Sequence, residues 1–417
     1  MGIIRSILPV PEPGPVRQLI TSSAILNLGA GLQEVLIPFF LLAHCFASLE
    51  VTGIVLSITA LGALIAVVPA GYLCEKIPAR NVVFLAGSVQ AVATLGLIIT
   101  NSIPVVAVVL CVCTVMAQVS RIARSSMVAG MPVEKRTVAR AQMSVWSNLG
   151  VGAGMALTVV FLSIDTRWAF NLGFIVTAAC FFFSAHLRRR SFQPKDILKT
   201  GGAGTSSAIT LASLTNKRLI SVSAAHLVLY FHQVLLTVGV SLWVAADDRL
   251  PNWLAGLTLV VNLLIAIAAQ NTVAMRIKTP AHAIKAWAVA FGIAGSAIAI
   301  FAVATSYRLP VQLTIAAILL TILLLSLAEL WYVAGEMEMS VLFAAYDGSA
   351  SAQAVFLLGR DIASVIGPLG LTLLISHQAL PRWFVIIIVF VAFACGLWVW
   401  ASTRSRRDAG YASRGFH

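Results

Sequence analysis

The chain has 417 residues, of which 59% are hydrophobic and only 10% are charged. A typical soluble domain has about 25% charged residues, so this composition excludes a soluble enzyme. It equally excludes a disordered chain, which would be charged and poor in apolar residues. Only helices and closed barrels can span a lipid bilayer. Because the apolar runs are continuous rather than alternating, we expect an all-α integral membrane protein.

Twelve apolar segments are long enough to cross a bilayer, which takes about 20 residues. In chain order they are Gln18–Phe46, Val51–Cys74, Val82–Thr100, Pro104–Val128, Val138–Ser163, Trp168–Leu187, Leu219–Ala245, Asn252–Met275, Ile284–Ser306, Leu309–Gly335, Ser349–Ser376 and Arg382–Thr403. The longest connection, 188–218, contains a Gly- and Ser-rich run and divides the spans into six plus six. We therefore predict a tail over 1–17, a six-helix bundle over 18–187, a central loop over 188–218, a second six-helix bundle over 219–403 and a tail over 404–417.

Basic residues gather in the connections on one side of the predicted spans. That side holds Arg5, Arg17, Lys76, Arg80, Lys135, Arg136, Arg188, Arg189, Arg190, Arg276, Lys278, Arg404, Arg406 and Arg407, whereas the other side holds Arg167, Arg249, Arg308 and Arg382. Since Lys and Arg favour cytoplasmic loops, we expect both termini, and the central loop, to be cytoplasmic. The net charge of +13 is then explained by inner loops beside anionic lipid headgroups, and no nucleic-acid partner is expected.

A short sequence repeats about half a chain apart. Lys76–Ala79, after the second span, reads Lys-Ile-Pro-Ala, and Lys278–Ala281, after the eighth, reads Lys-Thr-Pro-Ala. Each lies at the equivalent place in a six-helix half. Two six-helix repeats joined by a long loop are the layout of secondary transporters whose halves move around a site near the middle of the membrane.

The segment Gly71–Arg80 resembles the loop between spans two and three of the major facilitator superfamily, which reads G-x-L-(A/D)-D-(R/K)-x-G-(R/K)-(R/K). The matching positions are Gly71, Leu73, Lys76 and Arg80; Glu75 keeps the carboxylate, and Pro78 and Ala79 depart from the pattern. The resemblance covers nearly the whole chain. It implies twelve helices in two pseudo-symmetric six-helix bundles, a bacterial inner (plasma) membrane and a monomeric transporter.

A glycine-rich stretch in the fifth span, Asn148–Gly154, resembles a motif of the drug/proton antiporter branch, the multidrug or natural-product exporters, although its Pro is absent. Glycines at this spacing give a thin helix face that allows close helix approach. We expect Asn148, Gly150 and Gly154 to lie where the two halves meet, and Gly367 and Pro368 to match them in the eleventh span. The alternative is tight packing without any role in transport.

Ionisable residues within the spans are candidates for proton coupling, because each costs at least about 2.5 kcal/mol at the centre of a membrane on insertion scales. Glu34 lies among apolar neighbours in the first span and Glu329 lies in the tenth. Removal from water favours the neutral form of a carboxyl, so both could bind and release a proton. The resemblance adds Arg121, since the family often has an Arg in the fourth span that assists proton transfer. The alternatives are structural hydrogen bonds for the carboxyls and snorkelling of Arg121 to the headgroups.

Polar and aromatic residues within the spans are candidates for a substrate cavity: Asn27, Gln33, His226, Asn262, Trp331 and Tyr332. A lone His in a membrane is more often a hydrogen-bonding residue, and aromatics more often pack or face lipid. Arg360 and Asp361 are adjacent, and neighbours on a helix point about 100° apart. We therefore expect each of them to pair with another span, as a conformational lock.

These features favour a proton-coupled exporter of small amphipathic organic compounds, with one intramembrane carboxylate in each half. Its direction is implied mainly by the resemblance. The alternatives are an importer, which the same carboxylates would serve, and an integral membrane transferase. A transferase needs clustered acidic residues, and the acidic doublet Asp247-Asp248 lies in an outer loop. We expect no catalytic residues, no metal and no cofactor beyond the coupling proton; the partners are a small-molecule substrate and the lipid bilayer.

Overall fold

The computed structural model describes residues 15–129, 133–164, 166–189, 215–277, 279–307, 309–346, 350–376 and 380–414. Within these ranges twelve helical segments are long and apolar enough to cross a membrane, which confirms the predicted all-α architecture. They are Val16–His44, Leu49–Cys74, Ala79–Ile99, Ile103–Ser125, Val145–Ile164, Arg167–Arg189, Leu219–Ala246, Trp253–Gln270, Pro280–Ser306, Val311–Met339, Val355–Ser376 and Pro381–Trp400.

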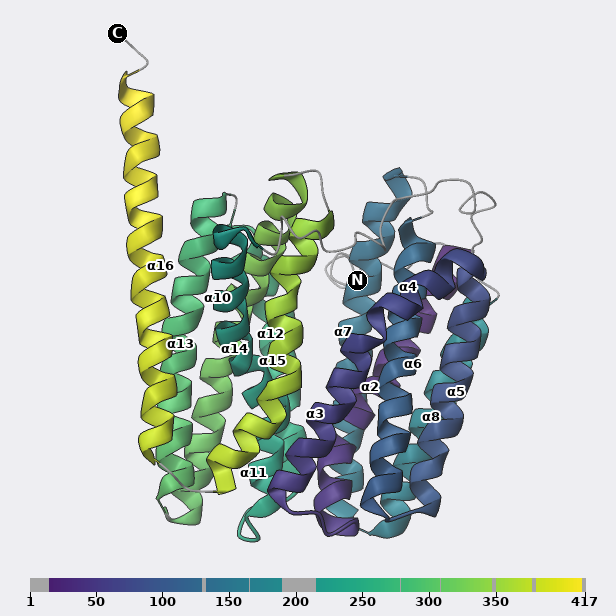
Figure 1. The fold of residues 1–417 in the computed structure, drawn as a ribbon. Helices are drawn as coiled ribbons and strands as arrows, with labels where there is room; N and C mark the ends of the chain where they lie inside the picture. The colour runs from purple at the N-terminus through teal and green to yellow at the C-terminus, as the bar shows by residue number, and fades with distance from the viewer. Residues whose placement is uncertain are drawn as a thin grey trace, which may run out of the picture. The chain divides into compact units, whose positions relative to one another are not determined.

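The chain forms two compact units (Figure 1). The first unit comprises Met1–Ser206 with Val244–Ala246 and Pro251–Val260. Its helices are α2 (Pro15–Phe39), the π-helical turn η1 (Phe40–His44), α3 (Leu49–Ile65), α4 (Val67–Lys76), α5 (Ala79–Ile99), α6 (Ile103–Ala129), α7 (Val133–Ile164) and α8 (Arg167–Arg189). The second span is divided into α3 and α4 at Ala66, because Pro69 has no N–H to donate to the Ile65 carbonyl four residues earlier.

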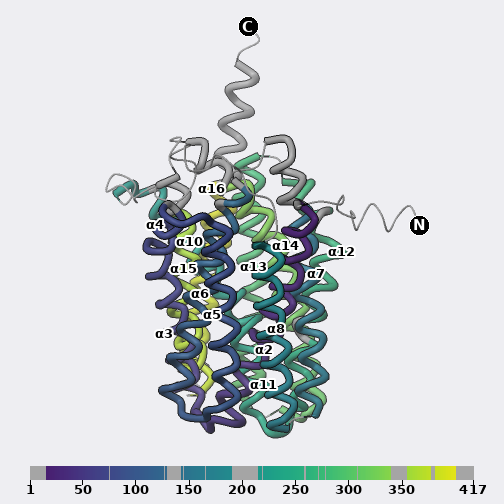
Figure 2. The backbone as a smooth tube through the Cα atoms, turned by 90° about the vertical axis from the view of Figure 1, so that its right-hand side faces the viewer, coloured from purple at the N-terminus to yellow at the C-terminus, as the bar shows by residue number. Residues whose placement is uncertain are grey.

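Helices of the first unit pack along their length. Figure 1 and Figure 2 show α5 beside both α6 and α8, and α2 packs on α7 and α8. Along α7, a Cβ on Gly150 would lie 2.2 Å from the Ala24 carbonyl oxygen, and one on Gly154 would lie 2.1 Å from the Leu28 carbonyl oxygen. The glycine face therefore packs on α2 of its own unit, which favours the alternative of tight helix packing. Asn148 on the same helix is exposed.

The second unit comprises Ser207–Trp243, Asp247–Leu250 and Val261–His417. The helices in this half of the chain are α10 (Lys217–Val234), the π-helical turn η2 (Leu235–Gly239), α11 (Val240–Ala246), α12 (Trp253–Ala274), α13 (Pro280–Ser306), α14 (Val311–Tyr346), α15 (Ala350–Ser376) and α16 (Leu380–Arg414). Helix α13 packs on α14 and α16, and its Trp287, Phe291 and Phe301 are fully buried.

The contact between first and fifth helices occurs in both units. In the second unit α10 packs on α15, and a Cβ on Gly359 would lie 2.0 Å from the Ser223 carbonyl oxygen. A Cβ on Gly367 would lie 2.8 Å from a methyl carbon of Val234, and Pro368 follows Gly367 inside α15. In each unit, therefore, the first and fifth spans approach backbone to backbone at a glycine: α2 and α7 in the first unit, α10 and α15 in the second.

Candidate functional site

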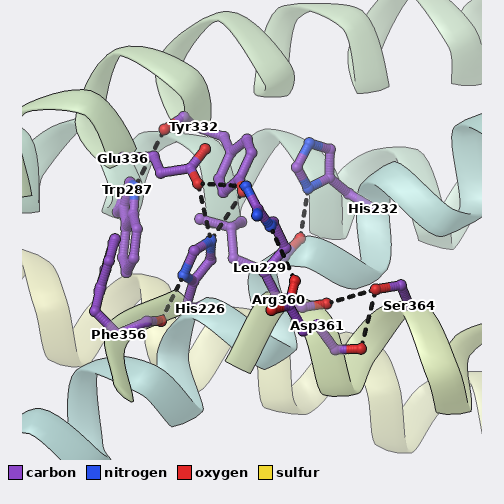
Figure 3. A network of polar contacts seen from close by, with 10 residues as sticks. All are labelled: His226, Leu229, His232, Trp287, Tyr332, Glu336, Phe356, Arg360, Asp361 and Ser364. Atoms are coloured by element: carbon purple, nitrogen blue, oxygen red, sulfur yellow. Dashed lines mark hydrogen bonds and ion pairs between the residues drawn. The ribbon is translucent and has the colours of Figure 1, made fainter. Parts of the chain in front are cut away.

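A buried polar cluster joins α10, α14 and α15 in the second unit (Figure 3). We call His226, Tyr332, Glu336, Arg360 and Asp361 the His226 cluster. The His226 ring is fully buried; its Nε2 lies 2.8 Å from the Tyr332 hydroxyl and 3.7 Å from a Glu336 carboxylate oxygen. The Arg360 guanidinium donates to the same carboxylate oxygen at 3.2 Å. The cluster thus links three helices through hydrogen bonds and an ion pair.

Arg360 and Asp361 behave differently from each other. Arg360 does pair with another span, through Glu336 of α14. Asp361, however, lies with a carboxylate oxygen 3.5 Å from Nε of Arg360, its own neighbour. Helix geometry turns the two Cβ atoms apart, but the long Arg side chain is flexible enough to fold back. The ion pair between Arg360 and Asp361 is therefore local, and the link between helices is made by Arg360 and Glu336.

Aromatic rings enclose His226. The ring stacks on Phe356 with centroids 4.7 Å apart and lies 5.3 Å from the centroid of Trp287. Trp287 donates its indole N–H to the Tyr332 carbonyl oxygen at 3.2 Å, which fixes the ring against α14. Such walls keep water away, and hydrogen bonds and charges interact more strongly in an environment of low dielectric.

A second polar contact lies between α12 and α14. The Asn262 side chain hydrogen-bonds the Glu329 carboxyl. The other carboxyl oxygen, Oε2 of Glu329, and the amide oxygen of Asn262 are both buried without a hydrogen-bond partner among the described residues. A carboxylate oxygen and an amide oxygen can only accept. The site therefore offers two acceptors and lacks a donor.

Glu329 lies on the same face of α14 as Tyr332 and Glu336, the two members of the His226 cluster that this helix contributes. Glu329, Tyr332 and Glu336 follow each other at spacings of three and four residues, which places them on the same side of a helix. Trp331 lies outside this series and is half-buried. We expected Tyr332 to offer its ring to a cavity, but Tyr332 is packed inside the cluster.

The candidates from the first span lie on α2 of the first unit. Glu34 is exposed on α2, whereas its neighbours Leu32, Val35 and Leu36 are buried. Those neighbours point to other sides of α2, because successive residues are about 100° apart. Asn27 donates to the Ser23 carbonyl oxygen of its own helix at 2.7 Å.

Gln33 and Arg121 are two further candidates of the first unit. Gln33 hydrogen-bonds the buried Cys113 thiol of α6, which is a structural contact between spans. Arg121 is exposed near the end of α6. The contact with Cys113 gives Gln33 a packing role between spans, and the exposure of Arg121 near the end of α6 agrees with the snorkelling alternative.

The loop motif marks the end of α4 and the start of α5. Gly71 is buried and Leu73 is half-buried, while Lys76 is exposed with its ammonium 4.5 Å from the centre of the Tyr72 ring. Nε of Arg80 is buried without a hydrogen-bond partner among the described residues. The side chain of Glu75 lies outside the described part of the chain.

Arg188 is a buried residue that the sequence does not single out. We expected it at the start of the central loop, but it lies in the last turn of α8 and is only 1% exposed. Its guanidinium donates to the Ser22 hydroxyl at 3.1 Å, to the Ser22 carbonyl at 3.2 Å and to the Ser120 hydroxyl at 3.4 Å. Arg188 thereby joins α8 to α2 and α6.

Comparison with known proteins identifies the family. The profile described as the Major Facilitator Superfamily matches residues 19–368 of the chain. The chain belongs to the major facilitator superfamily. No curated protein matches its sequence significantly.

Solved structures of major facilitator transporters share the fold. One, described as a POT family transporter in complex with a thioalcohol conjugated peptide, is 13% identical with a TM-score of 0.73, over 93% of this chain and 96% of that chain. A second is the nucleoside transporter NupG, 14% identical with a TM-score of 0.69, over 94% of this chain and 99% of that chain. A third, a bacterial homologue of the human drug peptide transporters, is 13% identical with a TM-score of 0.68, over 94% and 98%. At such identities the likeness establishes the fold alone.

Membership of the major facilitator superfamily makes the chain a multi-pass membrane transporter of small molecules rather than an enzyme. The sequence indicates Glu329, His226, Tyr332, Arg360 and Asp361 as candidates but not their shared setting. Glu336 is visible in the sequence as a charge that follows Glu329 toward the helix end. Trp287, Phe356 and Arg188 give no signal, because only packing distinguishes them from other residues of their kind.

Proposed function

We propose that this major facilitator transporter is proton-coupled and exports small amphipathic organic compounds by alternating access. The observation that carries the proposal is the buried Oε2 of Glu329, which has no hydrogen-bond partner among the described residues and adjoins the equally unpartnered amide oxygen of Asn262. An ionised carboxylate away from water is costly unless a partner offsets its charge. A bound proton or a donor group on the substrate would each relieve this cost.

Competition between these two occupants gives antiport. A proton bound to Glu329 neutralises the carboxylate and removes its attraction for a substrate donor, whereas loss of the proton restores that attraction. Protons and substrate would therefore occupy the site in turn, and the proton gradient would drive the substrate in the opposite direction. The coupled halves of such a fold move around a fixed site in the middle of the membrane.

The His226 cluster is the second element of the proposal. It lies on the same face of α14 as Glu329, and it ties this face to α10 and α15 through His226 and Arg360. A change in protonation at Glu329 would reach the helix contacts through Tyr332, one turn further along α14. We propose Glu34, exposed on α2, as the carboxylate of the other half.

The mainly apolar spans favour amphipathic substrates over sugars, because few polar side chains are available to bind many hydroxyls. Export follows the resemblance of the sequence to drug/proton antiporters. The solved neighbours include a nucleoside transporter and peptide transporters, which supports import of a small organic solute as the second candidate. Both directions use the same carboxylates.

The test is proton flux in proteoliposomes that contain a pH-sensitive dye and an imposed pH gradient. A panel of lipophilic amines, nucleosides, short peptides and neutral metabolites is added to protein of known orientation. We expect proton flux triggered by substrate and opposite to substrate movement, with loss of flux in Glu329→Gln. The matched control is Glu338→Gln on the same helix but off the Glu329 face.

Three results would contradict the proposal. Substrate movement without any proton flux would show a transporter with a different driving force. Flux of protons and substrate in the same direction would establish the importer. Retained coupling in Glu329→Gln, together with loss in Glu34→Gln, would move the coupling site to the first unit.

A further inference from the structure

A groove of about 300 Å³ lies at one end of the first unit, between α4, α5 and α8. Five apolar side chains line it together with the polar Asn81 and Arg189; the apolar ones are Leu73, Ile77, Val82, Phe84 and Leu85. We call it the Arg189 groove. Since one water occupies about 30 Å³ of liquid, the groove is large enough for a headgroup phosphate and part of an acyl chain.

The Arg189 groove lies at the ends of three membrane spans, where lipid headgroups are expected. Ile77 belongs to the connection between the second and third membrane spans, and Arg189 is the last residue of the sixth span. This is the end of the spans at which the basic connections gather, with Lys76 and Arg80 on the same loop. Leu85 is exposed, and its apolar surface continues from the groove along α5.

Arg189 is held in position by the groove itself. Its guanidinium carbon lies 4.7 Å from the centre of the Phe84 ring. A guanidinium that stacks on an aromatic face keeps its N–H groups free at the edge, where they match the oxygens of a phosphate. The adjacent Arg188 points the other way, into the unit, and makes its hydrogen bonds with Ser22 and Ser120.

The charges and surfaces of the groove are complementary to one class of molecule. The described lining residues include a cation and an amide but no acidic side chain. Basic pockets between transmembrane helices on the cytoplasmic side are typical binding sites for anionic headgroups. The apolar walls formed by Ile77, Phe84 and Leu85 match a hydrocarbon chain rather than a soluble anion.

We propose that the Arg189 groove binds one anionic phospholipid. Its phosphate accepts hydrogen bonds from Arg189 and from the Asn81 amide, and the beginning of an acyl chain lies against Phe84 and Leu85. The lipid would connect the loop between α4 and α5 to the end of α8. A bilayer lipid would thereby become part of the first unit.

The experiment is native mass spectrometry of the full chain purified in a neutral detergent and titrated with phosphatidylglycerol or with phosphatidylcholine of the same acyl chains. We expect one phosphatidylglycerol to be retained at concentrations at which phosphatidylcholine is lost. Arg189→Gln should weaken phosphatidylglycerol binding about fivefold, the effect of one basic residue near a membrane surface. Arg276→Gln removes one exposed charge from the equivalent loop of the second unit and should leave this binding unchanged.

Three results would overturn the proposal. Equal retention of the two lipids would mean that the groove does not discriminate between an anionic and a zwitterionic headgroup. Equal weakening in Arg189→Gln and Arg276→Gln would indicate general electrostatic attraction. Displacement of the lipid by excess glycerol 3-phosphate would identify a site for a soluble phosphate. If Arg189→Gln does not fold, Asn81→Ala, which keeps the charge and removes the amide, provides the same comparison.

Discussion

The Tyr332 hydroxyl oxygen lies 2.8 Å from Nε2 of His226, inside the second unit. On the other side of the ring, Nδ1 lies 3.0 Å from the Phe356 carbonyl oxygen, which can only accept. Nδ1 therefore carries the hydrogen, and the neutral ring presents Nε2 as an acceptor for the Tyr332 hydroxyl. The Glu336 carboxylate also hydrogen-bonds this hydroxyl. The hydroxyl hydrogen of Tyr332 thus has two acceptors, Nε2 of His226 and the Glu336 carboxylate. A proton added at Nε2 would remove the first acceptor, and the hydroxyl would then donate to Glu336 alone.

Tyr332→Phe should destabilise the protein by about 1–3 kcal/mol, because a buried ring nitrogen of His226 loses its donor. The measurement is thermal unfolding in detergent. Tyr307→Phe, at an exposed tyrosine at the end of α13, removes the same hydroxyl and should have little effect. Equal shifts of Tm in the two variants would mean that the hydroxyl does not stabilise the cluster.

The ion pair between Glu336 and Arg360 should be strongly coupled. Arg360→Gln removes the cation that pairs with the partly buried Glu336, for which we expect a loss of about 1–3 kcal/mol. Glu336→Gln should cost less, because Arg360 keeps its ion pair with Asp361. The double variant should lose clearly less than the sum of the single losses. Additive losses at Glu336 and Arg360 would contradict the interaction.

Gly154→Ala should disrupt the contact between α7 and α2, because the new Cβ would lie 2.1 Å from the Leu28 carbonyl oxygen. Overpacking of this kind costs about 1–3 kcal/mol or more, and both partners here are backbone. Gly292→Ala in α13 is the control, since nothing lies within 4 Å of its new Cβ and Ala is the better helix former. The yield of folded protein and the Tm after purification distinguish the two. A Gly154→Ala variant as stable as Gly292→Ala would refute the close contact.

Arg188→Lys should destabilise the first unit although it keeps the charge. A lysine cannot reproduce the planar fork that bonds Ser22 and Ser120 together. We expect a loss of about 1–3 kcal/mol from the hydrogen bonds that remain unmade. Arg189→Gln, at the next residue but pointing outward, should unfold close to the wild-type temperature in a neutral detergent without lipid. The reverse order of stability would place the structural role on Arg189.

The spans could be predicted from the sequence because a membrane helix is recognisable from its local run of apolar residues alone. Each of its residues contributes to one continuous apolar stretch, as in Ala79–Ile99 and Pro280–Ser306, and no distant contact is needed to recognise it. An isolated charge within such a stretch is equally visible, which is why Glu329 could be singled out.

The arrangement of the polar side chains could not be predicted in the same way. Glu34 and Glu329 both have apolar neighbours in sequence, yet Glu34 is exposed while Glu329 has a buried carboxyl oxygen. The difference depends on which side of the helix meets other helices. Trp287 and Phe356 lie far apart in the chain, and only the packing of α13 on α14 and of α10 on α15 brings their rings to His226.

The glycine contacts have a mechanical consequence. Where α7 meets α2 and where α15 meets α10, the backbones touch without side chains to cushion them, at Gly150 and Gly154 in one unit and at Gly359 in the other. Interfaces between helices normally allow small shear movements because side chains can change rotamer. A backbone-to-backbone contact has no rotamers to change, so sliding one helix along the other by a fraction of a turn would make atoms overlap. We therefore expect each of these helix pairs to move as one rigid body. The large movements of transport should then occur at the surrounding helix contacts that are made by side chains.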